Sequence, residues 1–167
     1  DLDAVVAKLT LTGLSEQAID IDLPKALKGA MPGNIWSSSY WYQGAFADQP
    51  ESVALAKAYT EKTGDANPHA FSALSHTGVK AYAKAIEANG GKTDSGSVID
   101  AMENIKMSTA KGEAYFRKED HQIITSGSAF NAGPSTSNPL GWEIKDFAAI
   151  DLGKITNAAE PGKEFKI

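Results

Sequence analysis

The 167-residue chain contains no cysteine and a single arginine, Arg117. Without cysteine it forms no disulfide, no thiolate metal site and no cysteine nucleophile. The formal net charge is −5 at pH 7, and an acidic chain with one arginine is poorly suited to bind nucleic acid. No apolar run approaches the ~18 residues of a membrane-spanning helix. The absence of cysteine fits both a cytoplasmic and a periplasmic protein, so composition leaves the compartment open.

What is present is typical of a folded globular protein, because 42% of the residues are apolar and 22% are charged. The length suits one ordinary domain or two small lobes. The first eight residues, DLDAVVAK, read as the middle of a helix and carry neither an initiator methionine nor a signal peptide. We therefore expect the sequence to be part of a longer protein.

Strand and helix patterns alternate along the chain, which predicts an α/β fold. Alternating, β-branched and aromatic residues predict strands at 9–13, 35–42, 115–117 and 123–124, and a final strand pair or strand–helix edge at 142–150. Capping residues and glycine stops predict a short helix and turn within 14–33, and longer helices at 50–63, at 70–89 and from 94 or 95 to about 105. The segment 131–139 is rich in Ser, Asn, Gly and Pro and is predicted to be a loop.

The three histidines do not form a recognisable enzyme or metal motif. His69 and His76 are seven residues apart, about 10 Å along a helix, which is too far to share one ion. Asp120 precedes His121, but adjacent residues of a strand point to opposite faces, and no Gly-x-Ser-x-Gly motif accompanies them. We expect Asp120 and Gln122 to satisfy backbone groups at a turn. A hydrolase using His121 or His76 stays as an alternative; no metal and no cofactor is predicted.

Aromatic residues are concentrated around a serine segment, as Trp36, Tyr40, Trp41 and Tyr42 flank residues 37–39. Alternation along a strand sends Trp36 and Tyr40 to one face and Trp41 to the other. Aromatic side chains on both faces fit a ligand cleft at the edge of a domain. Packing of the same side chains against neighbouring helices is the alternative.

Several motifs occur in an order that resembles a known family. Gly33-x-x-Trp36-Ser-Ser-Ser-Tyr-Trp precedes a helix that opens on Pro50, and Asn67-Pro68-His69-Ala70-Phe71 leads into the next helix. The run GEAYFRKEDHQ follows at 112–122, and its FRKEDHQ portion is the most specific motif. The chain resembles the C-terminal half of the branched-chain amino acid type substrate-binding proteins of ABC importers, which have the type I periplasmic binding protein fold.

The resemblance implies two α/β lobes that are joined by crossovers and close on a solute. Residues 1–37 would belong to the second lobe, 38–120 to the first lobe, and 121–167 to the return segment and tail of the second lobe. The crossings would lie near 37–40 and 119–122. In the family, the opening half supplies the hydroxyls and backbone amides for an amino acid's carboxylate, and that half lies outside this sequence.

The resemblance implies two ligand-binding residues, Glu16 and Phe71, and the aromatic segment adds Tyr40 and Trp41. Glu16 falls where amino-acid-binding relatives hold the ligand ammonium, and a carboxylate suits this role because a charge-assisted hydrogen bond fixes the amine. Phe71 corresponds to an apolar or aromatic wall of the pocket, and Tyr40 and Trp41 would add further walls. A surface role for Glu16 and simple core packing for Phe71 stay open. The aromatic crossing favours a larger or aromatic solute over a small aliphatic amino acid.

By the same resemblance the protein is not an enzyme and is periplasmic or lipid-anchored outside the cell. It would capture an amino acid or a related small carboxylate or aromatic solute and present it to an ABC permease in the membrane. No cofactor and no nucleic acid partner is implied. A ligand-sensing receptor or regulator domain of the same fold is the alternative, because both kinds of protein bind solutes by the same closure.

Overall fold

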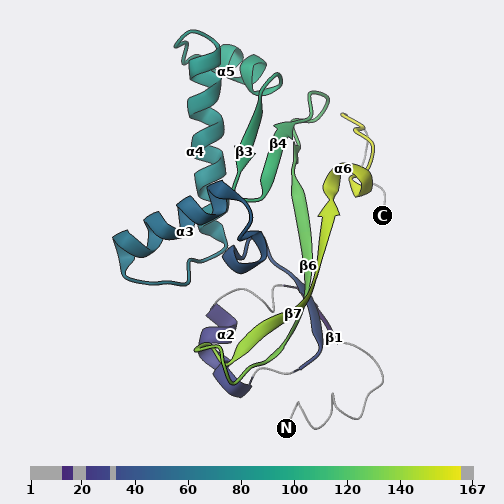
Figure 1. Cartoon of the computed structure of the whole chain (residues 1–167). Coiled ribbons are helices and arrows are strands. Elements are labelled where there is room, and N and C mark those ends of the chain that lie inside the picture. Colours follow the sequence, from purple (N-terminus) through teal and green to yellow (C-terminus); the bar gives the residue numbers. More distant parts are fainter. Residues whose placement is uncertain (1–12, 17–21, 31–32, 163–167) are drawn as a thin grey trace.

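The structure is a computed structural model that describes residues 13–16, 22–30 and 33–162. Figure 1 shows two bodies, one above the other, joined by long strands that run between them. In chain order the elements are β1 (Gly13–Glu16), α2 (Asp22–Leu27), η1 (Lys28–Ala30), β2 (Ile35–Ser38), η2 (Gln43–Phe46), α3 (Pro50–Thr63), α4 (Phe71–Ala88), α5 (Ser95–Met102), β3 (Lys106–Thr109), β4 (Gly112–Phe116), β5 (Ile123–Ile124), β6 (Ser126–Pro134), β7 (Trp142–Asp151) and α6 (Leu152–Ile155).

The lower body, here called the four-stranded lobe, consists of α2 and a sheet with the strand order β1-β2-β6-β7. β1 and β2 are parallel, whereas β6 pairs antiparallel with both β2 and β7. Phe130 and Ala132 of β6 and Trp142 of β7 are buried together and form the core of this lobe. The sheet therefore joins segments from both ends of the chain.

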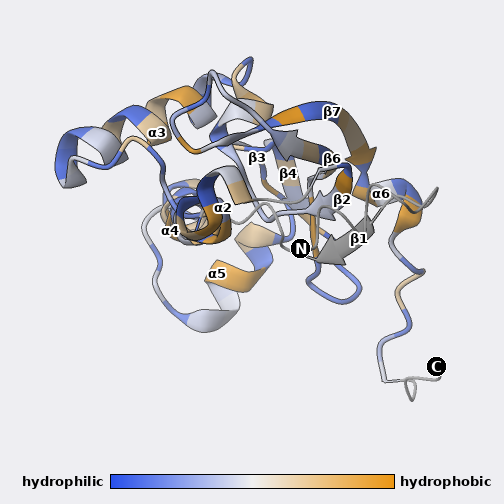
Figure 2. Ribbon diagram, turned by 90° about the horizontal axis from the view of Figure 1, so that it is seen from below, coloured by the Kyte–Doolittle hydropathy of each residue, from blue (hydrophilic) through white to orange (hydrophobic). Residues whose placement is uncertain are grey.

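The upper body, here called the helical lobe, contains α3, α4, α5 and a small sheet with the order β3-β4-β5. Figure 2 shows the three helices on one side of the molecule and β1, β2, β7 and α6 on the other. Alanines at positions 73, 81 and 85 form the buried face of α4, and Ala81 packs against Met107 and Ala114 of the small sheet. Small side chains on this face let the helix approach the strands closely. The helical lobe thus has a core of its own.

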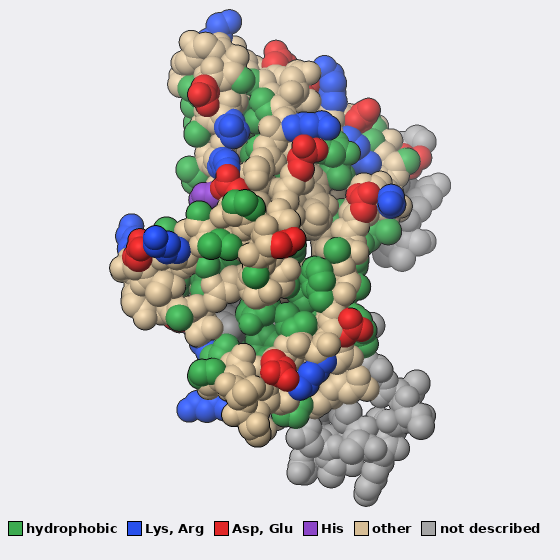
Figure 3. All heavy atoms as spheres, in the orientation of Figure 1, with side chains coloured by type: hydrophobic (Ala, Val, Ile, Leu, Met, Phe, Trp, Pro, Cys, Tyr) green, Lys and Arg blue, Asp and Glu red, His purple; other side chains and the backbone are tan. Residues whose placement is uncertain are grey.

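The two lobes share an apolar junction. Tyr42 and Ala45, which follow the crossing from β2, pack against the Phe130 cluster of the four-stranded lobe. The rings of Phe46 and Phe147 lie 6.2 Å apart in an edge-to-face arrangement, which aromatic pairs favour. Figure 3 shows apolar side chains gathered in the hollow between the two bodies.

The helices at 50–63 and 71–88 agree closely with the sequence-based expectation. A glycine with φ of 75° ends α3 at position 64, as a left-handed helix cap requires. The third helix ends at Met102 instead of near residue 105. The predicted strand at 9–13 and the helical start lie outside the described residues, except for Gly13, which begins β1.

Two sequence-based expectations are wrong. The segment 35–42 is a strand only as far as Ser38, because the chain leaves the sheet and the Ser39 hydroxyl bonds the Trp41 carbonyl at 3.3 Å. The predicted loop at 131–139 is a strand as far as Pro134, because residues 131–133 are buried and residues 131 and 132 pair with neighbouring strands on both sides. The segment 142–150 forms one continuous strand.

The division into segments 1–37, 38–120 and 121–167 stays a prediction. β2 ends at Ser38, next to the first predicted boundary. β5 pairs with β4 of the helical lobe, so residues 123 and 124 still belong to that lobe, just beyond the second predicted boundary.

Candidate functional site

The crossing after β2 carries an exposed group of rings. The rings of Tyr40 and Phe71 lie 5.4 Å apart, and His69 stacks on Phe71 at 4.9 Å. His69 Nδ1 accepts a hydrogen bond from the Phe71 amide at 3.2 Å, which fixes the imidazole at the start of α4. Tyr40 is 40% exposed and Phe71 is 51% exposed. This group, the aromatic stack, presents a partly uncovered apolar surface where the chain passes between the lobes.

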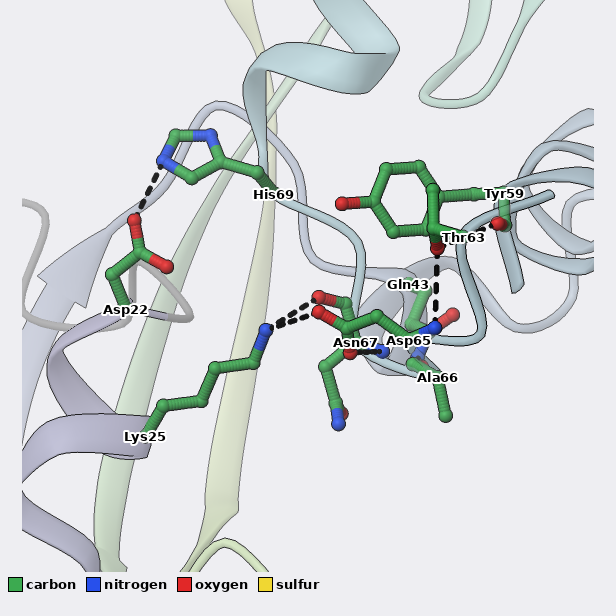
Figure 4. A network of polar contacts seen from close by, with 9 residues as sticks. All are labelled: Asp22, Lys25, Gln43, Tyr59, Thr63, Asp65, Ala66, Asn67 and His69. Atoms are coloured by element: carbon green, nitrogen blue, oxygen red, sulfur yellow. Dashed lines mark hydrogen bonds and ion pairs between the residues drawn. The ribbon is translucent and has the colours of Figure 1, made fainter.

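A second set of side chains ties the two lobes together beside the aromatic stack (Figure 4). Lys25 of α2 donates to Asp65 Oδ2 at 2.7 Å and to the Asn67 carbonyl at 3.1 Å. Asp22, at the start of α2, lies 3.3 Å from His69 Nε2 and forms an ion pair when the imidazole is protonated. We call these contacts between α2 and the α3–α4 loop the interlobe clasp. They hold the four-stranded lobe against the helical lobe.

The loop side of the interlobe clasp is ordered by its own hydrogen bonds. Asp65 accepts from the Asn67 amide at 2.8 Å, and the Asp65 amide donates to the Thr63 hydroxyl at 3.1 Å. Gln43 donates to the Ala66 carbonyl at 2.7 Å. The hydrogen bond from Lys25, followed by that from the Asn67 amide, lowers the pKa of the Asp65 carboxyl. The hydrogen bond from Lys25 therefore favours the charged form of the Asp65 carboxyl.

Tyr40 also borders a cavity of about 290 Å³ at the point where the crossing segments meet, here called the hinge cavity. The β3–β4 turn reaches it from the helical lobe, and the first residues of β6 and the β7–α6 junction close it from the other side. Burial lowers the pKa of the lysine in that turn, Lys111. The other lining residues are Ser38, Ser39, Gly127, Ser128, Ile150 and Leu152.

His121 does not form a catalytic pair with Asp120. His121 Nε2 lies 2.9 Å from Glu103 Oε1, and Lys118 lies 3.1 Å from the other oxygen of that carboxylate. Hydrogen bonds from His121 and Lys118 lower the pKa of Glu103. Asp120 pairs with Arg117 and accepts from the Gln122 amide at 3.2 Å. The predicted turn role of Asp120 is confirmed, and this cluster fastens α5 to the turn before β5.

Two absences apply to the described residues. No group of three or more His, Asp or Glu side chains in that part of the chain is placed to hold a metal ion. Within the same ranges, no helix is both long enough and apolar enough to cross a membrane.

The sequence matches a family model over residues 6–134, and that model is described as periplasmic binding protein. The chain belongs to this family. No curated protein sequence matches it.

Solved structures share the fold of this periplasmic binding protein. An ABC-type branched-chain amino acid transporter protein from Rhodopseudomonas palustris CGA009 has a TM-score of 0.72 at 22% identity, over 90% of this chain and 38% of its own. The leucine-, isoleucine-, valine-, threonine- and alanine-binding protein from Brucella ovis, in a closed conformation, has a TM-score of 0.72 at 18% identity, over 98% of this chain and 42% of its own. A solute-binding protein from R. palustris HaA2 in complex with p-hydroxybenzoic acid has a TM-score of 0.69 at 20% identity, over 90% and 40%.

These likenesses confirm the predicted α/β type I periplasmic binding protein fold. The chain spans about two-fifths of the length of these solved structures. The four-stranded lobe and the helical lobe therefore correspond to only part of each relative.

The four predicted ligand-binding residues of this periplasmic binding protein differ in their placement. Tyr40 and Phe71 come together in the aromatic stack. The backbone of Glu16 ends β1 and pairs in register with Ser38, at the edge from which the chain crosses. Trp41 is only 1% exposed, and its indole nitrogen donates to the Ser52 hydroxyl at 3.1 Å. A pocket-wall role for Trp41 stays a prediction that this burial does not favour.

Several residues of the site have no signal in the sequence. Lys111 lies in a strand turn, where lysine is common and usually solvated. Lys25 and Asp65 are 40 residues apart, and neither belongs to a motif. Only the tertiary arrangement brings these charges to the region between the lobes, so local patterns could not reveal them.

Proposed function

We propose that this chain is part of an extracytoplasmic solute-binding protein of an ABC importer. The protein would capture an amino acid or a related small carboxylate or aromatic solute, in the periplasm or from a lipid anchor, and deliver it to a membrane permease. One observation carries the proposal: a member of the periplasmic binding protein family leaves the rings of Tyr40 and Phe71 partly uncovered beside the crossing between its lobes. Such rings are suited to cover an apolar solute.

The mechanism is closure of one lobe over the other. A solute that contacts both lobes favours the closed arrangement by the difference in its affinity for the two states. The interlobe clasp acts in the same direction, because its contacts exist only when α2 lies against the α3–α4 loop. Solute binding and the interlobe clasp therefore favour the same closed arrangement of the lobes.

Each predicted residue has a distinct role in the proposal. Phe71 and Tyr40 supply the apolar wall, and Trp41 supports the crossing from the core. Glu16, whose backbone lies beside Ser38, would bind the ammonium of an amino acid. Proteins of the same fold include a leucine-, isoleucine-, valine-, threonine- and alanine-binding protein and a protein in complex with p-hydroxybenzoic acid. Both kinds of ligand carry a carboxylate.

Titration calorimetry with leucine and with 4-hydroxybenzoate tests this function. We expect Phe71→Ala to weaken binding of either solute about tenfold, because a solvent-facing aromatic contact is removed. Val79→Ala, on an exposed position of the same helix, is the matched control and should have no effect. No binding of either solute by the folded protein of which this chain is part would refute the proposal.

The role of Glu16 is tested separately in the same assay. Glu16→Ala should weaken leucine binding about tenfold, because a charge-assisted hydrogen bond is lost. It should leave 4-hydroxybenzoate binding unchanged, since that solute has no ammonium. Equal losses for both solutes would contradict the assignment of Glu16.

A further inference from the structure

The hinge cavity touches both lobes at the place where the chain crosses between them. The β3–β4 turn of the helical lobe contributes Lys111, and β6 of the four-stranded sheet contributes Ser128. The crossing after β2 contributes Ser38 and Ser39. Anything bound between Lys111 and Ser128 therefore joins the helical lobe to the four-stranded lobe.

Lys111 brings one positive charge to the hinge cavity. A hydrogen bond from its amide to the Thr109 hydroxyl, at 3.1 Å, and a left-handed Gly112 with φ of 95° shape the turn that presents it. Among the described residues, no carboxylate pairs with Lys111, and burial lowers the pKa of its ammonium. A partly desolvated ammonium without a counter-charge is unfavourable. The cavity therefore favours an anion.

A second polar group in the hinge cavity has no partner. Ser128 is 5% exposed, and its hydroxyl oxygen is buried without a hydrogen bond among the described residues. The Ser39 hydroxyl, by contrast, donates to the Trp41 carbonyl at 3.3 Å. Buried hydroxyls in native proteins are nearly always hydrogen-bonded, so an unpartnered one needs an explanation, for example a bound ion. An anion held by Lys111 would accept the hydrogen bond from Ser128.

The remaining walls of the hinge cavity decide which anions fit. Ile150 and Leu152 line it with apolar side chains. Leu152 can approach because position 127 is a glycine, whose added Cβ atom would lie 2.8 Å from Leu152 Cδ2. An ion must give up part of its water beside such walls, which costs less for chloride than for fluoride or sulfate. A dianion would also leave one negative charge without a partner, since Lys111 supplies one positive charge. The cavity therefore suits a small, weakly hydrated monovalent anion.

Solute capture leaves this pair of polar groups unused. Its proposed apolar wall consists of Tyr40 and Phe71, and Glu16 would bind an ammonium. The resemblance assigns the carboxylate of the solute to the opening half of the family's proteins, outside this sequence. Lys111 and Ser128 are therefore available to a ligand other than the solute.

We propose that the hinge cavity binds one small monovalent inorganic anion, such as chloride, between Lys111 and Ser128. The ion accepts hydrogen bonds from the ammonium and the hydroxyl, and it bridges the β3–β4 turn and β6. Because these elements belong to different lobes, the bound anion stabilises their relative orientation. The anion and the captured solute occupy separate sites, so the anion binds whether or not solute is present.

Chloride NMR on the folded protein of which this chain is part tests the site. Binding broadens the chloride line, and the broadening should be reversed by thiocyanate, which is weakly hydrated, but not by fluoride or sulfate. Lys111→Met should weaken chloride binding at least about tenfold, and Ser128→Ala about threefold to tenfold. The matched control Lys106→Met removes an exposed lysine from the same hairpin and should have no effect.

Thermal unfolding at constant ionic strength provides an independent test. Replacing fluoride by chloride should raise the Tm of the wild type by about 1–2 °C, because a ligand of the folded state stabilises it. In Lys111→Met this gain should be absent. In fluoride alone, the variant should melt no lower than wild type, because it removes an unpaired, partly buried charge.

A measurement on wild type guards against misfolding of the variants. The ε-methylene resonance of Lys111 should shift when chloride replaces fluoride. An unshifted resonance, or equal chloride broadening in wild type and folded Lys111→Met, refutes the anion site. If leucine or 4-hydroxybenzoate displaces chloride, the cavity belongs to the solute site, and the separate anion site is refuted while solute binding survives. If Lys111→Met lowers Tm equally in chloride and in fluoride, the ammonium pairs with a fixed carboxylate elsewhere in the protein, which also overturns the site for a free anion.

Discussion

Tyr40 and Trp41 are neighbours in the sequence but differ in burial. The aromatic segment suggested that Tyr40 and Trp41 face a cleft from opposite sides of a strand. Because the strand ends at Ser38, alternation no longer applies, and Trp41 turns into a cluster with Phe46, Ala73 and Ala110. Tyr40 stays at the surface. A short sequence pattern predicts that aromatic residues gather, but not which of them is buried.

The buried indole leads to a stability prediction. Ser52→Ala removes the hydroxyl that accepts the hydrogen bond from the Trp41 N–H at 3.1 Å. It should lower the free energy of unfolding by about 1–3 kcal/mol, because a buried donor is left unsatisfied. Urea denaturation followed by tryptophan fluorescence measures the change. Ser75→Ala, at an exposed position of α4, should have little effect. A neutral Ser52→Ala variant would show that the indole finds another partner.

At the scale of elements, the helices were more predictable than the strands. The sequences of α3 and α4 contain local signals, namely a proline start, an apolar face and glycine stops. These signals predicted the first and last residues of both helices to within one position. β6 lacks such local signals, since Asn131 is typical of a loop but is buried between β2 and β7, with which it pairs. Strand formation there depends on partners distant in the sequence, which local propensity does not record.

The start of α5 carries a pH-dependent prediction. Asp94 accepts a hydrogen bond from the Ser97 amide at 3.0 Å, and this bond lowers the pKa of the Asp94 carboxyl. The cap therefore stabilises the fold fully above the ordinary aspartate pKa and loses its effect as pH falls through the lowered value. Asp94→Ala should reduce Tm by about 3 °C at pH 7, with a smaller reduction at pH 3.

Asp100→Ala is the control for this effect. Asp100 is exposed within the same helix and has no capping role, so its substitution should change Tm little at either pH. Calorimetric scans at the two pH values measure both variants. A Tm difference for Asp94→Ala that is as large at pH 3 as at pH 7 would contradict an electrostatic cap.

For the molecule as a whole, the resemblance predicted two lobes and a crossing, but not the charges that join them. The interlobe clasp depends on the approach of α2 to the α3–α4 loop, and the hinge cavity depends on the approach of the β3–β4 turn to β6. Glu16, Tyr40 and Phe71 could be selected because they fall on family motifs. Lys25, Asp65 and Lys111 could not, because their roles arise only from tertiary contact.

The interlobe clasp can be tested by measuring the separation of the lobes. Because the chain has no cysteine, spin labels can be attached specifically at Ala26→Cys on α2 and Lys57→Cys on α3. Lys25→Met should increase the mean distance between the two labels and broaden its distribution, because the contacts of Lys25 with the α3–α4 loop are lost. High salt should do the same in wild type by screening the half-exposed ion pair.

Asp65→Asn should act in the same direction as Lys25→Met, and the two changes together should be less than additive, since both remove the Lys25–Asp65 ion pair. Lys62→Met removes an exposed lysine near the end of α3 and is the control. If the distance between the spin labels stays unchanged in Lys25→Met, the apolar junction alone sets the arrangement of the lobes.

The antiparallel pair β6 and β7 passes from one lobe to the other (Figure 1), and over residues 126–128 β6 pairs with β7 but not with β2. A hydrogen-bonded ladder resists stretching, whereas a two-stranded ribbon twists readily. The lobes should therefore reorient by torsion about the ribbon axis and not by pulling straight apart. A solute bound beside this axis would oppose that rotation. A small molecule near the crossing would thereby set the relative orientation of the four-stranded lobe and the helical lobe.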